Sequence, residues 1–224
     1  MKYEIKGHPF PIVTVDLETD EAVRCQNGAM AWMTPNMEMS TTVGGAKKAL
    51  GKMLSGENIF ENVYAARGGA GSITFAPDVP GEILVMEVSP ENVIIAQKSS
   101  FLVRQESVDM EIAFQRKLGT GVFGGEGFIM QKFVGNGLLF LQSGGTLINK
   151  NLAEGEVLLV QTGNLCAMES TVTMDIETVK GLGNMLVGGE GFFNTKLTGP
   201  GQVWIQTMPT SGLASAIRRY IPSR

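Results

Sequence analysis

The chain has 224 residues, enough to bury a sizeable hydrophobic core in one or two domains. Its hydrophobic fraction of 43% and charged fraction of 18% exclude a disordered chain, and its net charge of −4 gives no general attraction to nucleic acid. Glycine is abundant at 29 residues, and the absence of a Gly-X-Y period excludes collagen, so tight turns are expected.

The start of the chain predicts a cytoplasmic protein. Residues 1–6 contain no apolar segment of the kind that begins a signal peptide. No apolar run approaches the ~18 residues that a membrane-spanning helix needs. His8, the only histidine, lies in the extended stretch His8-Pro9-Phe10-Pro11, and we expect it to have no catalytic or metal-binding role.

An internal repeat organises the rest of the chain. Gly124-Gly125-Glu126-Gly127 recurs as Gly188-Gly189-Glu190-Gly191, and 190 − 126 = 64. Gln97 and Gln161 have the same offset, while Gln26 precedes Gln97 by 97 − 26 = 71 residues. The pattern predicts three copies, at 12–82, 83–147 and 148–210, before a C-terminal segment at 211–224.

Each copy has the alternation of short strands. Val108, Met110, Ile112 and Phe114 are apolar, and polar residues stand between most of them. Turn residues recur at matching places, at Thr19-Asp20, Pro90-Glu91 and Glu154-Gly155. The fold class predicted for 1–224 is therefore all-β, a sandwich or prism of three β repeats with pseudo-threefold symmetry in a single domain.

Two stretches depart from the strand pattern. Residues 46–54 have the spacing of one or two helical turns, although Gly51 weakens that interpretation. Residues 211–220 predict a short helix capped by Ser211, with Leu213, Ile217 and Tyr220 on one face. We expect this helix to dock on the β core.

Two glycine or cysteine patterns suggest chemistry but have simpler interpretations. Gly119, Gly121 and Gly124 match the dinucleotide pattern G-x-G-x-x-G, yet a strand-like run follows where that site needs a helix, so a hairpin or bulge is expected. Cys25 and Cys166 occupy apolar columns of the repeat, which predicts small buried hydrophobic residues. No cofactor or metal site is predicted.

Polar residues recur in the repeat at two positions. Glu57, Glu126 and Glu190 recur in the glycine turn, and Gln26, Gln97 and Gln161 recur in a strand. One interpretation is that each side chain satisfies backbone groups of its own copy. The other is a threefold-related polar site that holds an ion or a partner.

An aromatic column indicates burial on both faces of one strand. Phe140 and Trp204 occupy matching positions on the face opposite the apolar pairs Leu139-x-Leu141 and Val203-x-Ile205. Burial on both faces requires a second covering layer. Either a second copy of the chain or another part of the same chain can supply it.

The glycine turns also carry a family resemblance. Gly44-Gly45, Gly56-Glu57, the two Gly-Gly-Glu-Gly turns and Gly199-x-Gly201 make nearly the whole chain resemble bacterial proteins of unknown function related to mitochondrial-biogenesis proteins of the "altered inheritance of mitochondria" type. The resemblance implies three repeats, each like a subunit of the trp RNA-binding attenuation protein. It also implies membrane association in the mitochondrial members, and it supplies no catalytic residues.

Three functions remain open from the sequence. The first is a non-enzymatic β scaffold, a homo-oligomer that presents a surface to a protein or membrane partner. The second is a small-ligand- or RNA-binding module, although the negative charge and the scarcity of clustered bases make nucleic acid an unfavourable partner. The third is an enzyme that uses carboxylates such as Glu126 and Glu190.

Overall fold

The structure, a computed structural model, describes residues 1–41, 61–116, 127–178, 193–218 and 220–221. The described part is built almost wholly of antiparallel strands, with one α-helix near the C-terminus. The all-β prediction is therefore confirmed. Two predictions lie outside the described residues: the helical turns expected at 46–54 and the hairpin or bulge expected at the G-x-G-x-x-G pattern from Gly119 to Gly124.

The strands fall into an N-terminal strand, β1, and three blocks. β1 is Lys2–Lys6. The first block contains β2 (Ile12–Leu17), β3 (Ala22–Gln26), β4 (Met30–Met33), β5 (Met37–Thr41), β6 (Glu61–Ala66) and β7 (Gly71–Phe75). The second contains β8 (Gly81–Val88), β9 (Ile94–Gln97), β10 (Phe101–Gln105), β11 (Val108–Arg116), β12 (Phe128–Gly135) and β13 (Gly137–Gly144). The third contains β14 (Leu147–Leu152), β15 (Val157–Gln161), β16 (Leu165–Glu169), β17 (Thr173–Thr178), β18 (Phe193–Thr198) and β19 (Gly201–Gln206).

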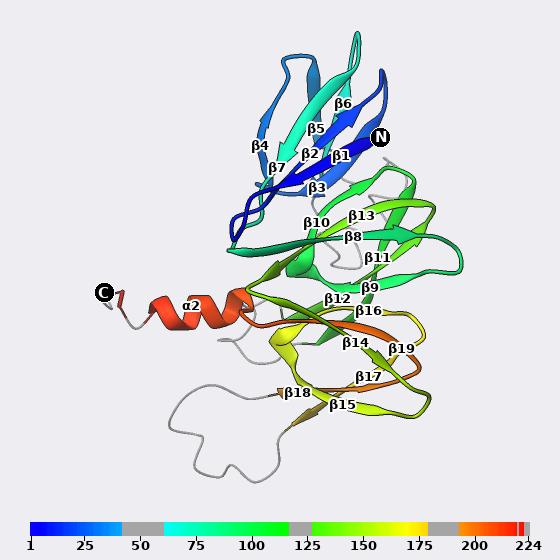
Figure 1. The fold of residues 1–224 in the computed structure, drawn as a ribbon, viewed down its shortest axis with the longest axis vertical. Helices are drawn as coiled ribbons and strands as arrows, with labels where there is room; N and C mark the ends of the chain where they lie inside the picture. Colours follow the sequence, from blue (N-terminus) through cyan, green and yellow to red (C-terminus); the bar gives the residue numbers. More distant parts are fainter. Residues whose placement is uncertain (42–60, 117–126, 179–192, 219, 222–224) are drawn as a thin grey trace.

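Four sheets follow one another along the long axis of the molecule (Figure 1). The first sheet has the order β1-β2-β7-β4 and the fourth has the order β15-β18-β17. The second sheet, β5-β6-β3-β10-β13-β8, takes one half from the first block and one half from the second. The third, β11-β12-β9-β16-β19-β14, joins the second and third blocks in the same way.

The two junctions between blocks have matching registers. In the second sheet Val103 of β10 pairs with Cys25 of β3, and in the third sheet Ala167 of β16 pairs with Ala96 of β9. A register shift also precedes both Val103 and Ala167. The pairing thus links each block to the next by the same strands, while the pseudo-threefold symmetry and the likeness to the trp attenuation protein stay predictions.

Hydrophobic cores fill the three spaces between successive sheets. The first includes Val15, Leu17, Cys25, Ile73, Phe75, Val103 and Phe140. The second includes Ile94, Ala96, Phe101, Phe133, Leu139, Leu141, Ala167 and Trp204. The third includes Phe128, Met130, Val160, Leu165, Met168, Leu197 and Val203. The second and third sheets are consequently covered on both faces.

The two-faced burial predicted for the aromatic column is therefore met within the chain. Phe140 lies in the first core, while its neighbours Leu139 and Leu141 lie in the second core on the opposite face of β13. Trp204 lies in the second core, opposite Val203 in the third. The covering layer is therefore another part of the same chain and not a second copy.

One detail of the predicted alternation is wrong. Val108 and Met110 lie in the second core as expected, but Phe114 packs against the third core. The register of β11 shifts between Ile112 and Phe114, which turns Phe114 to the other face of the strand. There its ring meets the edge of Phe128 at a centroid distance of 6.2 Å.

The second glycine turn of each later block requires glycine. Gly135 has φ +124°, and a Cβ on it would lie 2.3 Å from the carbonyl oxygen of Ser107. Gly201 has φ +136°, and its Cβ would lie 2.4 Å from Oγ1 of Thr171. Each of these positions combines a left-handed backbone with a close neighbour and therefore requires glycine, although the two are not equivalent in the repeat, since 201 − 135 = 66. The predicted turns at Thr19-Asp20 and Glu154-Gly155 are also present.

The C-terminal helix α2 spans Thr210–Arg218, close to its predicted start. The expectation that it docks along the β core is wrong. It packs near η3 (Thr162–Asn164) only at its beginning and then projects from the body (Figure 1). The backbone N–H of Met208 donates to the carbonyl of Gly144, which fixes the chain just before the helix at the margin of the sheets. Ile217 is left 49% exposed.

Candidate functional site: the junctions between blocks and the two end edges

The first junction contains a cluster of polar side chains around Gln142 of β13, which is buried. Its Nε2 donates to Oε1 of Gln26 at 3.0 Å and to the carbonyl of Ser99 at 2.9 Å. Its Oε1 accepts from the backbone N–H of Asp78 at 2.9 Å, and Gln26 donates to the Asp78 carboxylate at 2.9 Å. We call Gln26, Asp78 and Gln142 the first glutamine cluster.

The second junction repeats this arrangement around Gln206 of β19. Its Nε2 donates to Oε1 of Gln97 at 3.3 Å and to the carbonyl of Gly163 at 3.1 Å. Its Oε1 accepts from the backbone N–H of Gly144 at 2.9 Å. Gln206 therefore satisfies backbone groups of two successive blocks, and we call Gln97 and Gln206 the second glutamine cluster.

The structure brings two of the three predicted glutamines into equivalent places, although not into one common site. Gln26 lies in the second sheet and Gln97 in the third, and each meets a second glutamine. Gln161 ends β15 at an edge of the fourth sheet, is exposed, and makes no side-chain hydrogen bond within the described part of the chain. Glu57, Glu126 and Glu190 lie outside the described residues.

Sequence reasoning missed the partners of these glutamines. Gln142 and Gln206 differ by 206 − 142 = 64, the offset of the repeat. That offset was a sufficient signal, because each follows directly on one of the matched apolar pairs. Both carboxamides use their donors and acceptor on the protein, so the clusters have the chemistry of structural ties between sheets.

A buried ion pair crosses the first junction and was also missed. Arg104 donates through Nε and Nη2 to the two carboxylate oxygens of Glu61, at 2.8 and 2.7 Å, and also to the carbonyl of Val108. Arg104 is 5% exposed and Glu61 8% exposed. The bidentate geometry satisfies both charges in an environment where an unpaired charge would be strongly unfavourable.

The second junction has methionines in place of this ion pair. Glu61 pairs across the strands with Gln26, and Met130 pairs in the same way with Gln97. Arg104 corresponds to Met168, since they follow Val103 and Ala167 at the two junctions. Met130 and Met168 both lie in the third core. Corresponding positions at the two junctions are therefore filled by a charged pair at the first and by apolar side chains at the second.

The two thiols are buried, as predicted. Cys25 lies in the first core and Cys166 in the second. Burial, with a smaller contribution from the Glu61 carboxylate, raises the pKa of Cys25 from 9.0 to about 12. Burial also raises the pKa of Cys166 to about 11. Neither thiol has the exposed, ionised character of a reactive cysteine.

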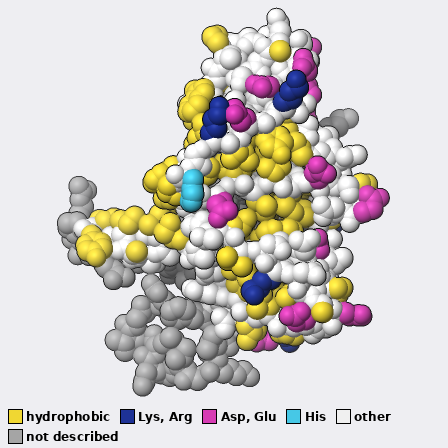
Figure 2. All heavy atoms as spheres, viewed as in Figure 1, with side chains coloured by type: hydrophobic (Ala, Val, Ile, Leu, Met, Phe, Trp, Pro, Cys, Tyr) yellow, Lys and Arg dark blue, Asp and Glu magenta, His cyan; other side chains and the backbone are white. Residues whose placement is uncertain are grey.

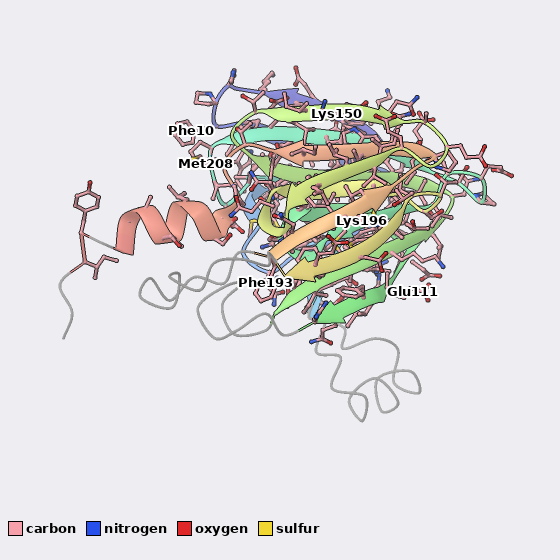
Figure 3. All side chains as sticks on the ribbon, turned by 90° about the horizontal axis from the view of Figure 1, so that it is seen from below. Phe10, Glu111, Lys150, Phe193, Lys196 and Met208 are labelled. Carbon is pink, nitrogen blue, oxygen red and sulfur yellow. The ribbon has the colours of Figure 1, made fainter. Side chains whose placement is uncertain are left out.

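The outer ends of the stack differ from the junctions because their edge strands have no partner in the described structure. β4 is an edge of the first sheet and β15 an edge of the fourth. Trp32 on β4 and Leu159 on β15 are each 56% exposed. Figure 3 looks at the fourth-sheet end, with Lys196 of β18 near the middle of the view.

The fold so described is an all-β stack of antiparallel sheets with structural polar clusters between its blocks. The chain belongs to the family described as "Mitochondrial biogenesis AIM24", which residues 3–208 match. Membership confirms the predicted family resemblance. Among the described residues no group of three or more potential metal ligands is found, and no helix has the length and apolar character needed to cross a bilayer.

Two relatives come from Streptococcus pyogenes. An uncharacterised protein of the serotype M6 strain is 30% identical over 234 aligned residues, which cover all of this chain and 92% of that protein. A structural-genomics crystal structure of a protein from that species has a TM-score of 0.81 and 26% identity, and the match covers 98% of this chain and 99% of that one. The chain thus shares its fold with a solved bacterial protein.

Proposed function

We propose that the protein is a non-enzymatic cytoplasmic β scaffold that self-associates and presents its C-terminal helix to a membrane surface. The observation that carries this proposal is the distribution of exposed apolar side chains. Exposed large apolar side chains include Trp32 and Leu159 at the two ends of the stack and Ile217, Tyr220 and Ile221 on and after α2. Exposed apolar groups gathered in this way mark interaction surfaces.

The interior of the described stack supports a scaffold. The buried glutamines bind one another and backbone groups, and the buried charges of Glu61 and Arg104 bind each other. These groups hold neighbouring blocks together. The three repeated units and their likeness to the trp attenuation protein fit the same proposal, since both describe a protein built by joining similar β units.

Helix α2 has the features of a segment that lies on a membrane. Figure 2 shows apolar side chains along it, apart from the body. Ile217 and Tyr220 are exposed, and Arg218 and Arg219 supply positive charge in the sequence beside them. Apolar and basic residues together favour an anionic lipid surface over a neutral one.

A flotation assay with the full chain tests the membrane role. We expect binding to vesicles of phosphatidylcholine and phosphatidylglycerol and weaker binding to phosphatidylcholine alone. Ile217→Glu should abolish binding, whereas Ser215→Glu, which places the same charge on the opposite exposed face, should weaken it only slightly. Equal loss in both variants, or no binding by the natural chain, would contradict a membrane role for α2.

Sedimentation equilibrium tests self-association separately. The chain has a mass of 24.0 kDa, so an oligomer appears as a multiple of that value. A mass that stays at 24.0 kDa at all concentrations would exclude a self-associating scaffold.

A further inference from the structure

The two ends of the stack expose the two kinds of strand that pair with each other at the junctions inside the chain. At each junction inside the chain, the β3 or β9 strand of one block pairs with the β10 or β16 strand of the next. The strand in the third block that corresponds to β3 and β9 is β15, and the strand in the first block that corresponds to β10 and β16 is β4. Both β15 and β4 lie at sheet edges.

The edge strands differ in charge according to this role. Among the strands of the described residues, six of the eight that lie at sheet edges carry at least one charged residue: β1, β5, β8, β11, β14 and β17. β4 reads MAWM and β15 reads VLLVQ, and neither has a charge. Charged side chains protect an exposed edge from pairing with another chain. Within the described part of the chain, the edges without this protection are therefore the two that would continue the stack.

We propose that β15 of one molecule pairs antiparallel with β4 of a second copy of the same chain. The register follows from the internal junctions, where Val103 pairs with Cys25 and Ala167 with Ala96. Trp32 corresponds to Val103 and Ala167, and Val160 corresponds to Cys25 and Ala96. The expected partners are thus Trp32 with Val160, Met33 with Leu159, and Thr34 with Leu158.

The pairing places exposed apolar side chains in the positions that cores occupy inside the chain. Val103 and Ala167 belong to the cores that precede their blocks, so Trp32 would cover the third core of the neighbouring molecule beside Val160. Leu159 corresponds to Ile95, which packs on the third core within the chain. Leu159 would accordingly pack on the first core of the neighbour.

One difference from the internal junctions shapes this contact. The first block has Ala76 after Phe75, where the later blocks have Gln142 after Leu141 and Gln206 after Ile205. Gln161 therefore has no second glutamine to bind. The contact between molecules depends on backbone pairing and apolar side chains, without the amide ties that strengthen the junctions inside the chain.

This proposal rests on the self-association in the proposed function and specifies its geometry. Because the two surfaces differ, the contact is head-to-tail, and repeated copies form either a closed ring or an open filament. The composite sheet between molecules has the order β17-β18-β15 followed by β4-β7-β2-β1 of the next copy.

Disulfide trapping between separately prepared variants tests the register. Met33→Cys chains and Leu159→Cys chains are mixed, allowed to exchange and oxidised. Directly opposed residues in an antiparallel pair lie about 4.5–5.5 Å apart at Cα, within disulfide range. The buried Cys25 and Cys166 do not compete. We expect a linked heterodimer from the mixture and none from either variant alone, and none from Leu159→Cys mixed with Ile148→Cys, an exposed position on the edge strand β14.

A charge on the edge provides the second measurement. Leu159→Lys should reduce the oligomer to a 24.0 kDa monomer with an unchanged circular dichroism spectrum, while Ile148→Lys should retain the oligomer. Links formed by Leu159→Cys or Met33→Cys alone would overturn the head-to-tail contact in favour of a twofold one. An oligomer that survives Leu159→Lys would overturn the proposed pairing of β15 with β4 but not the self-associating scaffold. A natural chain that is monomeric would overturn both proposals.

Discussion

Arg104→Met should destabilise the fold strongly, because it leaves the Glu61 carboxylate without its partner. Both side chains are nearly fully buried, and Arg104 donates to both carboxylate oxygens and to the carbonyl of Val108. Removing one member of a buried pair costs about 3–5 kcal/mol. For a chain of this length that cost corresponds to a fall in melting temperature on the order of 10 °C.

The double variant Glu61→Met/Arg104→Met should recover most of the lost stability. Met130 and Met168 already occupy the corresponding places at the second junction and pack in the third core. Replacing a buried ion pair by apolar side chains is often neutral or stabilising. We therefore expect the double variant to unfold within about 1 kcal/mol of the natural chain.

Urea denaturation followed by circular dichroism measures these free energies of unfolding. Arg24→Met is the matched control, because Arg24 pairs with Arg104 across the strands but forms a more exposed ion pair with Glu106. Its loss should cost less than about 1 kcal/mol. A double variant no more stable than Arg104→Met, or a cost for Arg104→Met as small as the control, would refute the equivalence of the two junctions.

Three further predictions concern single sites. Gly135→Ala should destabilise the chain by about 1–3 kcal/mol or more, while Gly155→Ala should cost less because its Cβ meets no atom within 4 Å; thermal unfolding compares them. Gln206→Leu should lower the free energy of unfolding by about 1–3 kcal/mol for each buried backbone group that it leaves unpaired, and urea denaturation measures this change. In the unfolded chain each thiol has a pKa near 9.0, whereas in the folded chain the pKa of Cys25 is about 12 and that of Cys166 is about 11. Both thiols therefore ionise more readily in the unfolded chain. The stability contributed by keeping them neutral is therefore present below pH 9 and lost as pH rises further, by up to about 1.4 kcal/mol per pH unit for each thiol, and Cys25→Ala should flatten the decline in urea midpoint between pH 9 and 10.5.

The strands could be predicted because their evidence is local. The alternation of Val108, Met110 and the polar residues between them reports one buried face, and the matched glycines report turns that a Cβ would block. The apolar column of Phe140 and Trp204 correctly indicated a strand buried on both faces. The sequence did not say whether the covering layer was the same chain or another.

The rest depended on pairings between distant residues. Nothing near Glu61 in sequence indicates Arg104, and Gln142 finds Gln26 across 116 residues. The position of α2 was mispredicted because an apolar helix face shows only that some surface should cover it. A register shift in β11 likewise turned Phe114 to the other core, and no period-two pattern contains that information.

The composite second and third sheets make the three blocks interdependent. A chain cut after the second block would lose β16, leaving the edge of β9 open, and would lose the fourth sheet that covers Phe128 and Met130. Each such cut opens a row of backbone donors and acceptors and uncovers half a core at once. The molecule should therefore resist stepwise dismantling, because no block can leave without uncovering the neighbour that it pairs with.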